Sequence, residues 1–128
     1  MITRAFLLAL AMIESGNQDI PGDGGLAQGP LQMHSISVAE ANRIIMLKGL
    51  PLLFQDSDRH ELVASMIMTK IIMTHWAKHW LKKGHKMTNA DFVAFHRWGP
   101  SQWKPNKTGS TKIDFDRSSK LKTILGDV

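Results

Sequence analysis

The residue best placed for chemistry is a carboxylate at the end of an apolar segment. Glu14 follows nine apolar residues and precedes residues 16–32, which hold five glycines and two prolines. Apolar surroundings raise the pKa of a carboxyl group, which keeps a proton available for a leaving oxygen near neutral pH. The pattern is therefore compatible with a general acid. It is equally typical of a solvent-exposed helix end followed by ordinary turns, and spacing alone favours that simpler interpretation.

Two ordered motifs carry a resemblance to a known family. The first is Glu14-Ser15-Gly16, and the second is the run Gly22-Asp23-Gly24-Gly25-Leu26-Ala27-Gln28-Gly29-Pro30-Leu31-Gln32-Met33. They resemble the Glu-Ser motif and the Gly-Asp-x-Gly and Gly-Leu-Met-Gln segments of soluble lytic transglycosylases and goose-type lysozymes. Small phage transglycosylase-like proteins are similar too, with an Asn-Arg helix matched here by Asn42-Arg43. The specific matches cover about a quarter of the chain, in the order that the family has them.

The resemblance implies a role for five residues. Glu14 matches the general acid, and Ser15 matches the serine that supports it. Asp23 matches an aspartate that positions water, although Gly-Asp-Gly is also a common turn. Gln32 matches a glutamine that lines the sugar cleft. His34 stands where goose-type enzymes often have a second aspartate, and this departure leaves the second half of the mechanism open.

A second departure concerns substrate contacts. Related proteins have an aromatic-Asn-Gly-Gly-Pro segment where this chain has Phe-His-Arg-Trp-Gly-Pro, residues 95–100. Arg97 and Trp98 are therefore the expected sugar contacts. Two mechanisms stay open. In an inverting hydrolysis Glu14 protonates the glycosidic oxygen while Asp23 orients a water, which needs carboxyl groups roughly 6.5–9.5 Å apart. In a transglycosylation Glu14 acts as acid and then as base, and the muramic acid C6 hydroxyl attacks.

The elements that must position these residues are mainly helices. Apolar periodicity, capping boxes and breakers predict helices over residues 2–15, 37–48, 58–83, 88–98 and 116–125. Residues 17–32 are expected to form turns and at most short strands, and 99–112 an exposed loop. The apolar stripe expected on the long helix is Leu62, Met66, Ile67, Ile71, Thr74 and Ala77. The first helix imitates a signal peptide, but no small-residue cleavage site precedes Glu14, which favours a buried helix.

Composition bounds the function classes without choosing among them. The 128 residues suit one domain, 1–128, and a net charge of +5 favours a polyanionic partner such as nucleic acid, an anionic membrane surface or a cell wall. The absence of cysteine excludes disulfides and thiolate metal sites. His75 and His79 are four apart, yet the glutamate and third ligand of a zinc site are missing. Trp98 and Trp103 are the better candidates for stacking on a sugar, and Trp76 and Trp80 for the core.

Together these patterns predict a mostly α (α+β) fold, lysozyme-like, with a small irregular glycine-rich lobe. The resemblance implies a monomeric peptidoglycan-cleaving glycosidase, a muramidase or lytic transglycosylase, that cuts the β-1,4 bond between N-acetylmuramic acid and N-acetylglucosamine. No cofactor, metal, membrane insertion or specific nucleic acid is expected, and the place of action is the cell wall, periplasmic, extracellular or virion-associated. Two rivals remain: a non-catalytic wall-binding or structural virion protein on the same scaffold, and a basic nucleic-acid-binding helical domain.

Overall fold

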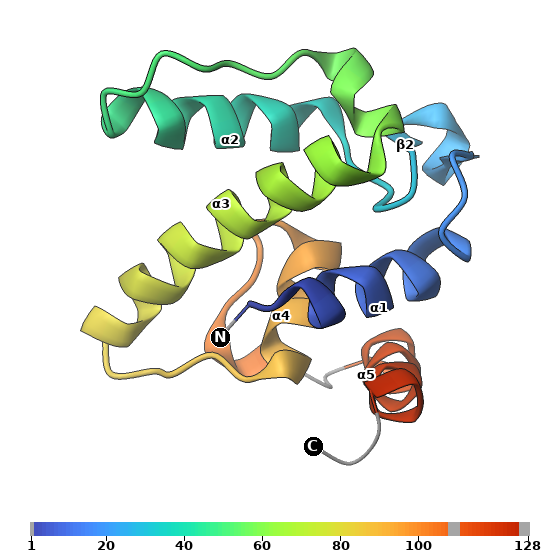
Figure 1. Ribbon diagram of the computed structural model, residues 1–128. Helices are drawn as coiled ribbons and strands as arrows, with labels where there is room; N and C mark the ends of the chain where they lie inside the picture. The colour runs from blue at the N-terminus through green and yellow to red at the C-terminus, as the bar shows by residue number, and fades with distance from the viewer. Residues whose placement is uncertain (1, 108–110, 126–128) are drawn as a thin grey trace. The chain divides into compact units, whose positions relative to one another are not determined.

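The computed structural model describes residues 2–107 and 111–125, and the chain there is mainly helical with one small sheet (Figure 1). The mostly α prediction with an irregular lobe is confirmed at this level. The chain divides into two compact units, residues 1–72 and 73–128. The helix α3 (Leu62–Lys82) contributes its first half to one unit and its second half to the other. The single domain 1–128 stays a prediction.

The first unit opens with helix α1 (Arg4–Ser15), whose N-terminus is capped by Thr3: its hydroxyl accepts a hydrogen bond from the Phe6 N–H at 3.1 Å. Gly16, with φ of 68°, ends the helix in the left-handed conformation, as the sequence predicts. Phe6, Leu7 and Leu10 are buried, while Met12 is half exposed. The expected buried helix is therefore correct for one face of α1.

The glycine-rich lobe, residues 16–34, joins α1 to α2 (Ser35–Leu47). It contains two antiparallel strands, β1 (Pro21–Gly22) and β2 (Ala27–Gln28), with a short 3-10 turn η1 (Asp23–Gly25) between them. This confirms the expectation of turns and short strands. The second helix begins at Ser35, two residues before its predicted start near Ser37; His34 occupies the N-cap position without a side-chain capping bond.

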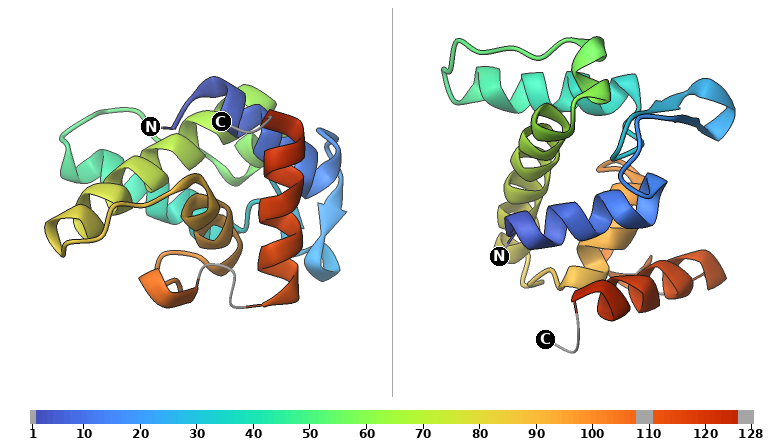
Figure 2. Two further views of the ribbon diagram at one scale, coloured as in Figure 1. Left: turned by 90° about the horizontal axis from the view of Figure 1, so that it is seen from below. Right: turned by 45° about the vertical axis from the view of Figure 1, so that its right-hand side comes forward.

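The chain after α2 doubles back along that helix (Figures 1 and 2). The Asn42 side chain fixes this return, accepting from the Phe54 N–H at 2.8 Å and donating to the Phe54 carbonyl at 2.9 Å. A 3-10 turn, η2 (Asp56–His60), follows, with a capping box between Gln55 and Asp58. The helix predicted from residue 58 therefore begins only at Leu62.

The buried face of α3 differs from the apolar stripe that the sequence predicts. Ser65, Met68, Thr69, Ile72 and Met73 are buried, whereas Ile67 is exposed. Two buried positions are hidden from a search for apolar periodicity because they carry hydroxyls. Ser65 donates to the Arg59 carbonyl at 3.0 Å, and the Thr69 hydroxyl lies 3.9 Å from the Met33 sulfur. Both hydroxyls have a partner, which reduces the cost of burying them.

The second unit contains the C-terminal half of α3, α4 (Asn89–Trp98), the 3-10 turn η3 (Pro105–Lys107) and α5 (Lys112–Leu125). The predicted capping box of α4 is confirmed: the Thr88 hydroxyl accepts from the Asp91 N–H at 3.1 Å, and Asp91 accepts from the Thr88 N–H at 2.9 Å. The last helix begins at Lys112, four residues before its predicted start. Within the described ranges, no helix combines the length and apolarity needed to cross a membrane.

Candidate functional site

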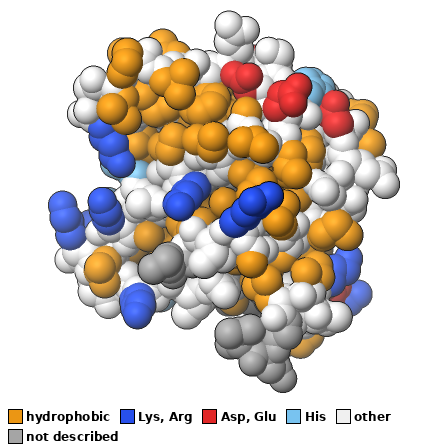
Figure 3. All heavy atoms as spheres, in the orientation of Figure 1, with side chains coloured by type: hydrophobic (Ala, Val, Ile, Leu, Met, Phe, Trp, Pro, Cys, Tyr) orange, Lys and Arg blue, Asp and Glu red, His pale blue; other side chains and the backbone are white. Residues whose placement is uncertain are grey.

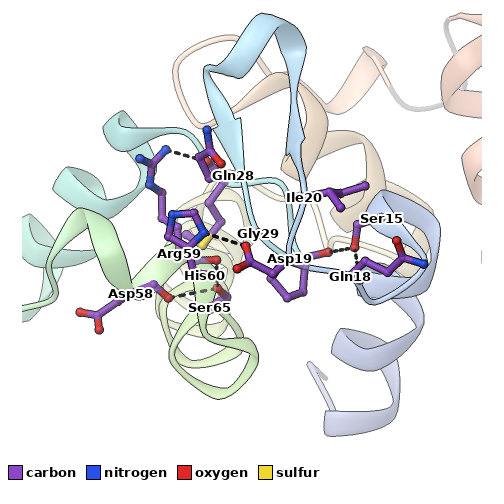
Figure 4. A network of polar contacts seen from close by, with 12 residues as sticks. Ser15, Gln18, Asp19, Ile20, Gln28, Gly29, Asp58, Arg59, His60 and Ser65 are labelled. Carbon is purple, nitrogen blue, oxygen red and sulfur yellow. Dashed lines mark hydrogen bonds and ion pairs between the residues drawn. The ribbon is translucent and has the colours of Figure 1, made fainter.

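The end of α1 is joined to the glycine-rich lobe by Ser15. Its hydroxyl donates to the Pro30 carbonyl at 2.7 Å and accepts from the Gln18 N–H at 3.0 Å (Figure 4). Glu14 lies beside it in the last turn of α1, and the carboxyl oxygen Oε1 of Glu14 is buried. The structure thus joins Ser15 of the first motif to Pro30 of the second, with Glu14 adjacent to Ser15 in α1. The Ser15 hydroxyl also lies 3.2 Å from the Ala11 carbonyl oxygen of α1, so its partners are backbone groups of both the helix and the lobe.

Gln32 holds the two sides of the lobe together from within. Its amide nitrogen donates to the Ile20 carbonyl at 2.7 Å and to the Gly29 carbonyl at 3.0 Å. A Cβ atom on Gly22 would lie 1.8 Å from the Gln32 side-chain oxygen, so a larger residue there would displace the Gln32 side chain from its present position. Gln32 itself has φ of 50°, an uncommon conformation for a residue other than glycine. The side chain expected to line a sugar cleft is thus used as a brace.

The side chains of Asp23 and His34 meet across the lobe. The His34 Nε2 atom lies 3.2 Å from the Asp23 carboxylate, and both side chains are well exposed. Asp23 has φ of 50°, which fits its place in the sharp turn between the strands. His34, which the resemblance placed at the position of a second aspartate, therefore lies beside Asp23. An aspartate held in this way links the tip of the lobe to the start of α2.

Three residues that the sequence analysis missed attach the lobe to η2. The Arg59 guanidinium donates to the carbonyls of Leu26 and Met33, at 3.3 and 3.2 Å. Asp19 and His60 point toward one another, with Oδ1 and Nδ1 2.7 Å apart (Figure 4). These contacts join residues that are 26 to 41 positions apart in the sequence. Contacts at such separations produce no periodic pattern, so the sequence does not reveal them.

Arg97 and Trp98 lie together in the second unit at the end of α4. The Arg97 guanidinium stands 4.5 Å from the centre of the Trp98 ring and donates to Asp114 at 2.8 Å. The Trp98 indole N–H donates to the same carboxylate at 3.2 Å. Burial alone raises the pKa of Asp114, but hydrogen bonds from Arg97, Trp98 and Thr111 and the Arg97 charge bring it below its ordinary value. This cluster ties α4 to α5.

Several other aromatic residues of the second unit form a series of ring contacts, most of them edge-to-face. Trp103 is completely buried and contacts Trp80, His85 and Phe95, so it cannot stack on a sugar as expected. His79 lies edge-on between Trp76 and Trp80. Among residues 2–107 and 111–125, no three His, Asp or Glu side chains stand close enough to hold a metal ion.

Comparison with known proteins gives one structural likeness. No family model and no curated protein matches the chain. The chain is similar to a solved structure, that of Aeromonas hydrophila PliI in complex with Meretrix lusoria lysozyme, with a TM-score of 0.68 and 18% identity. The match covers 98% of this chain and 92% of the other. At this identity the likeness shows the fold alone.

This finding corrects the enzyme that the resemblance implied. The likeness is to a complex of PliI, which binds a lysozyme, and it contradicts the interpretation of the chain as a peptidoglycan-cleaving glycosidase. The same finding contradicts the associated descriptions: hydrolase, lytic transglycosylase, bacteriolytic protein and phage lysin. The geometry gives a physical reason to look elsewhere, since Ser15, Gln32 and Asp23 all make contacts that hold the lobe.

Proposed function

We propose that the chain is a non-enzymatic binding domain that presents the glycine-rich lobe to a protein of the lysozyme class. The observation that carries the proposal is the rigid attachment of the lobe at several points. Ser15 fixes it to α1, Gln32 braces it internally, and Arg59 fixes it to η2. A loop held in one conformation before binding loses little conformational entropy when a partner docks. The solved complex of PliI with a lysozyme supports the class of partner.

Leu26 is the side chain best suited to anchor such a partner. It lies between η1 and β2 with 66% of its surface exposed, although it is apolar. Its carbonyl accepts from Arg59, so its backbone is held while its side chain faces solvent. Interfaces draw most of their binding energy from a few anchors in the middle of a complementary surface. An exposed leucine on a braced turn meets that requirement.

The test is direct binding to a panel of lysozymes that includes the Meretrix lusoria protein, by calorimetry and by inhibition of their lytic rate. We expect binding by the wild type and at least a tenfold loss in Leu26→Asp, as for removal of a central anchor. Leu50→Asp is the matched control, since Leu50 is an exposed leucine of the same unit outside the lobe. The proposal fails if no lysozyme binds, or if the chain alone releases peptidoglycan fragments and Glu14→Gln abolishes the release.

We propose further that the fold is lysozyme-like, on the order of its elements: a helix that ends just after Glu14, a two-stranded glycine-rich lobe, and helices after it. A monomer that meets its partner at the cell wall, outside the cytoplasm, fits a lysozyme-class partner.

Peptidoglycan glycan strands, bound without cleavage, are a second candidate ligand. The contact by which Ser15 joins the two motifs within one unit favours this candidate. Sedimentation of the same variants with peptidoglycan sacculi distinguishes binding to glycan strands from binding to a lysozyme.

A further inference from the structure

Lysine side chains gather on one face of the second unit. The second unit carries eleven Lys and Arg against four Asp and Glu, a net charge of +7, while the first carries five against seven, a net charge of −2. Figure 3 shows blue side chains gathered over the C-terminal part of α3. The basic face, as we call it, comprises five exposed lysines: Lys78, Lys82, Lys83, Lys86 and Lys104.

The structure keeps these lysines close to one another. Lys78 and Lys82 are four residues apart on α3, and therefore on the same side of the helix. The backbone N–H of His85 returns to the Trp80 carbonyl at 2.9 Å, which holds Lys86 against the end of the helix. The Lys104 ammonium lies 5.8 Å from the centre of the Trp80 ring. Three separate parts of the unit thus converge on one surface.

No carboxylate of the described second unit neutralises this face. Asp91 is buried at the cap of α4, and Asp114 is buried between Arg97 and Trp98. Asp116 faces Lys112 on α5, at 3.9 Å. No described residue forms an ion pair with any lysine of the basic face. An uncompensated cluster of this kind attracts a polyanion.

The occupant that fits best is a lipid surface. Stacking of bases, on which binding of single-stranded nucleic acid depends, needs open aromatic faces. Here Trp76 and Trp80 contact histidine edges, and Trp80 also contacts Trp103 and Lys104. Leu81, by contrast, lies among the lysines with 59% of its surface exposed. An exposed apolar side chain next to lysines on a helix end suits the boundary between headgroups and acyl chains.

We propose that the basic face docks on the surface of an anionic phospholipid bilayer, with the lysines on the phosphates and Leu81 inserted among the headgroups. The contact is peripheral, since it uses the side of a helix end. It is independent of the lobe and of the partner proposed for it. The attraction weakens with salt because the lysines are exposed and are screened over roughly 10 Å at 0.1 M salt and about 3 Å at 1 M.

The test is co-sedimentation of the full chain with phosphatidylcholine vesicles, with and without phosphatidylglycerol. We expect binding that requires phosphatidylglycerol, is lost at high salt, and falls at least about tenfold in Lys82→Glu/Lys83→Glu. Lys120→Glu/Lys122→Glu on α5 changes the net charge equally and is the matched control. Leu81→Ala is expected to weaken vesicle binding without changing how that binding depends on salt. Circular dichroism confirms that each variant folds.

Three results would overturn the proposal. The first is equal binding to phosphatidylcholine alone. The second is an equal loss in the α5 control, since that would trace the attraction to net charge and not to this face. The third is tight binding of DNA by the same lysines with no sedimentation on phosphatidylglycerol vesicles. Binding to a lysozyme is measured on a different unit of the chain, so its failure leaves these results distinguishable.

Discussion

Gly29 is the residue at which the lobe comes closest to η2. A Cβ atom at Gly29 would lie 1.8 Å from the Arg59 carbonyl oxygen, which also accepts a hydrogen bond from Ser65. The φ of Gly29 is 84°, in the region that glycine occupies without strain. The close approach to the Arg59 carbonyl and the positive φ thus each disfavour a side chain at Gly29. The rigidity that the proposed function requires rests on contacts of this kind.

Gly29→Ala is expected to lower the free energy of unfolding by about 3 kcal/mol, from left-handed strain plus overpacking against the Arg59 carbonyl. Gly24→Ala is the control, because Gly24 has φ of 65° but no atom within 4 Å of the position that a Cβ would take. It should cost about 1 kcal/mol from strain alone. Urea unfolding followed by far-ultraviolet circular dichroism measures both. Equal losses would show that the approach to η2 is not tight.

At this scale the predicted site residues divide between the two units, since Arg97 and Trp98 lie in the second unit. Glu14, Ser15, Asp23, Gln32 and His34 all belong to one unit, as the two ordered motifs suggest. Their roles in substrate binding or chemistry stay predictions. The bonds between them could not be foreseen, since the amide of Gln32 reaches the Ile20 carbonyl 12 residues away. Residue types and spacing carry no information about which polar group will face which carbonyl.

Helix boundaries were predictable where a local signal marks them. The Thr88–Asp91 capping box and the left-handed Gly16 act within four residues, and both occur as expected. The start of α3 was not predictable, because Gln55 and Asp58 cap a 3-10 turn that interrupts the helix pattern. Its buried face was missed for a different reason. Ser65 and Thr69 are buried through tertiary contacts, and a search for apolar periodicity passes over them.

Thr88→Ala tests how much the cap contributes to α4. The substitution removes the acceptor for the Asp91 N–H and should lower the free energy of unfolding by about 1 kcal/mol. Thr123→Ala is the control, since the Thr123 hydroxyl makes an exposed bond to the Ser119 carbonyl within α5. We expect that change to stay within about 0.5 kcal/mol. Tryptophan fluorescence during urea unfolding measures both. A loss in the control as large as that in Thr88→Ala would contradict the assignment.

Across the whole molecule, charge is distributed unevenly between the two units, and this could be read only once the units were known. The net charge of +5 is the sum of +7 in residues 73–128 and −2 in residues 1–72. The mostly α fold class was predictable from helical periodicity. The enzymatic assignment is contradicted by the likeness to the complex of PliI with a lysozyme. The two proposed contacts, protein at the lobe and lipid at the basic face, divide along the same boundary.

The buried Asp114 makes the stability of the molecule depend on pH. Its pKa is lowered in the folded state, so the ionised carboxylate contributes to the free energy of unfolding. That contribution is complete above the ordinary pKa of about 3.9 and is lost as the pH falls through the lower pKa of the folded state. Asp114→Asn leaves the Arg97 guanidinium without its charge partner and should cost about 3 kcal/mol at pH 7. The difference from the wild type should narrow steadily below about pH 4.

Guanidinium unfolding followed by tryptophan fluorescence suits this measurement, because Trp76, Trp80, Trp98 and Trp103 all lie in the unit that contains Asp114. Asp116→Asn is the control: its carboxylate is exposed and 3.9 Å from the Lys112 ammonium, so its removal should cost between about 0 and 1 kcal/mol. A loss in Asp114→Asn that stayed constant down to acid pH would locate its effect in hydrogen bonding and not in charge. Arg97 and Trp98 would then depend on their hydrogen bonds to Asp114 and not on its charge.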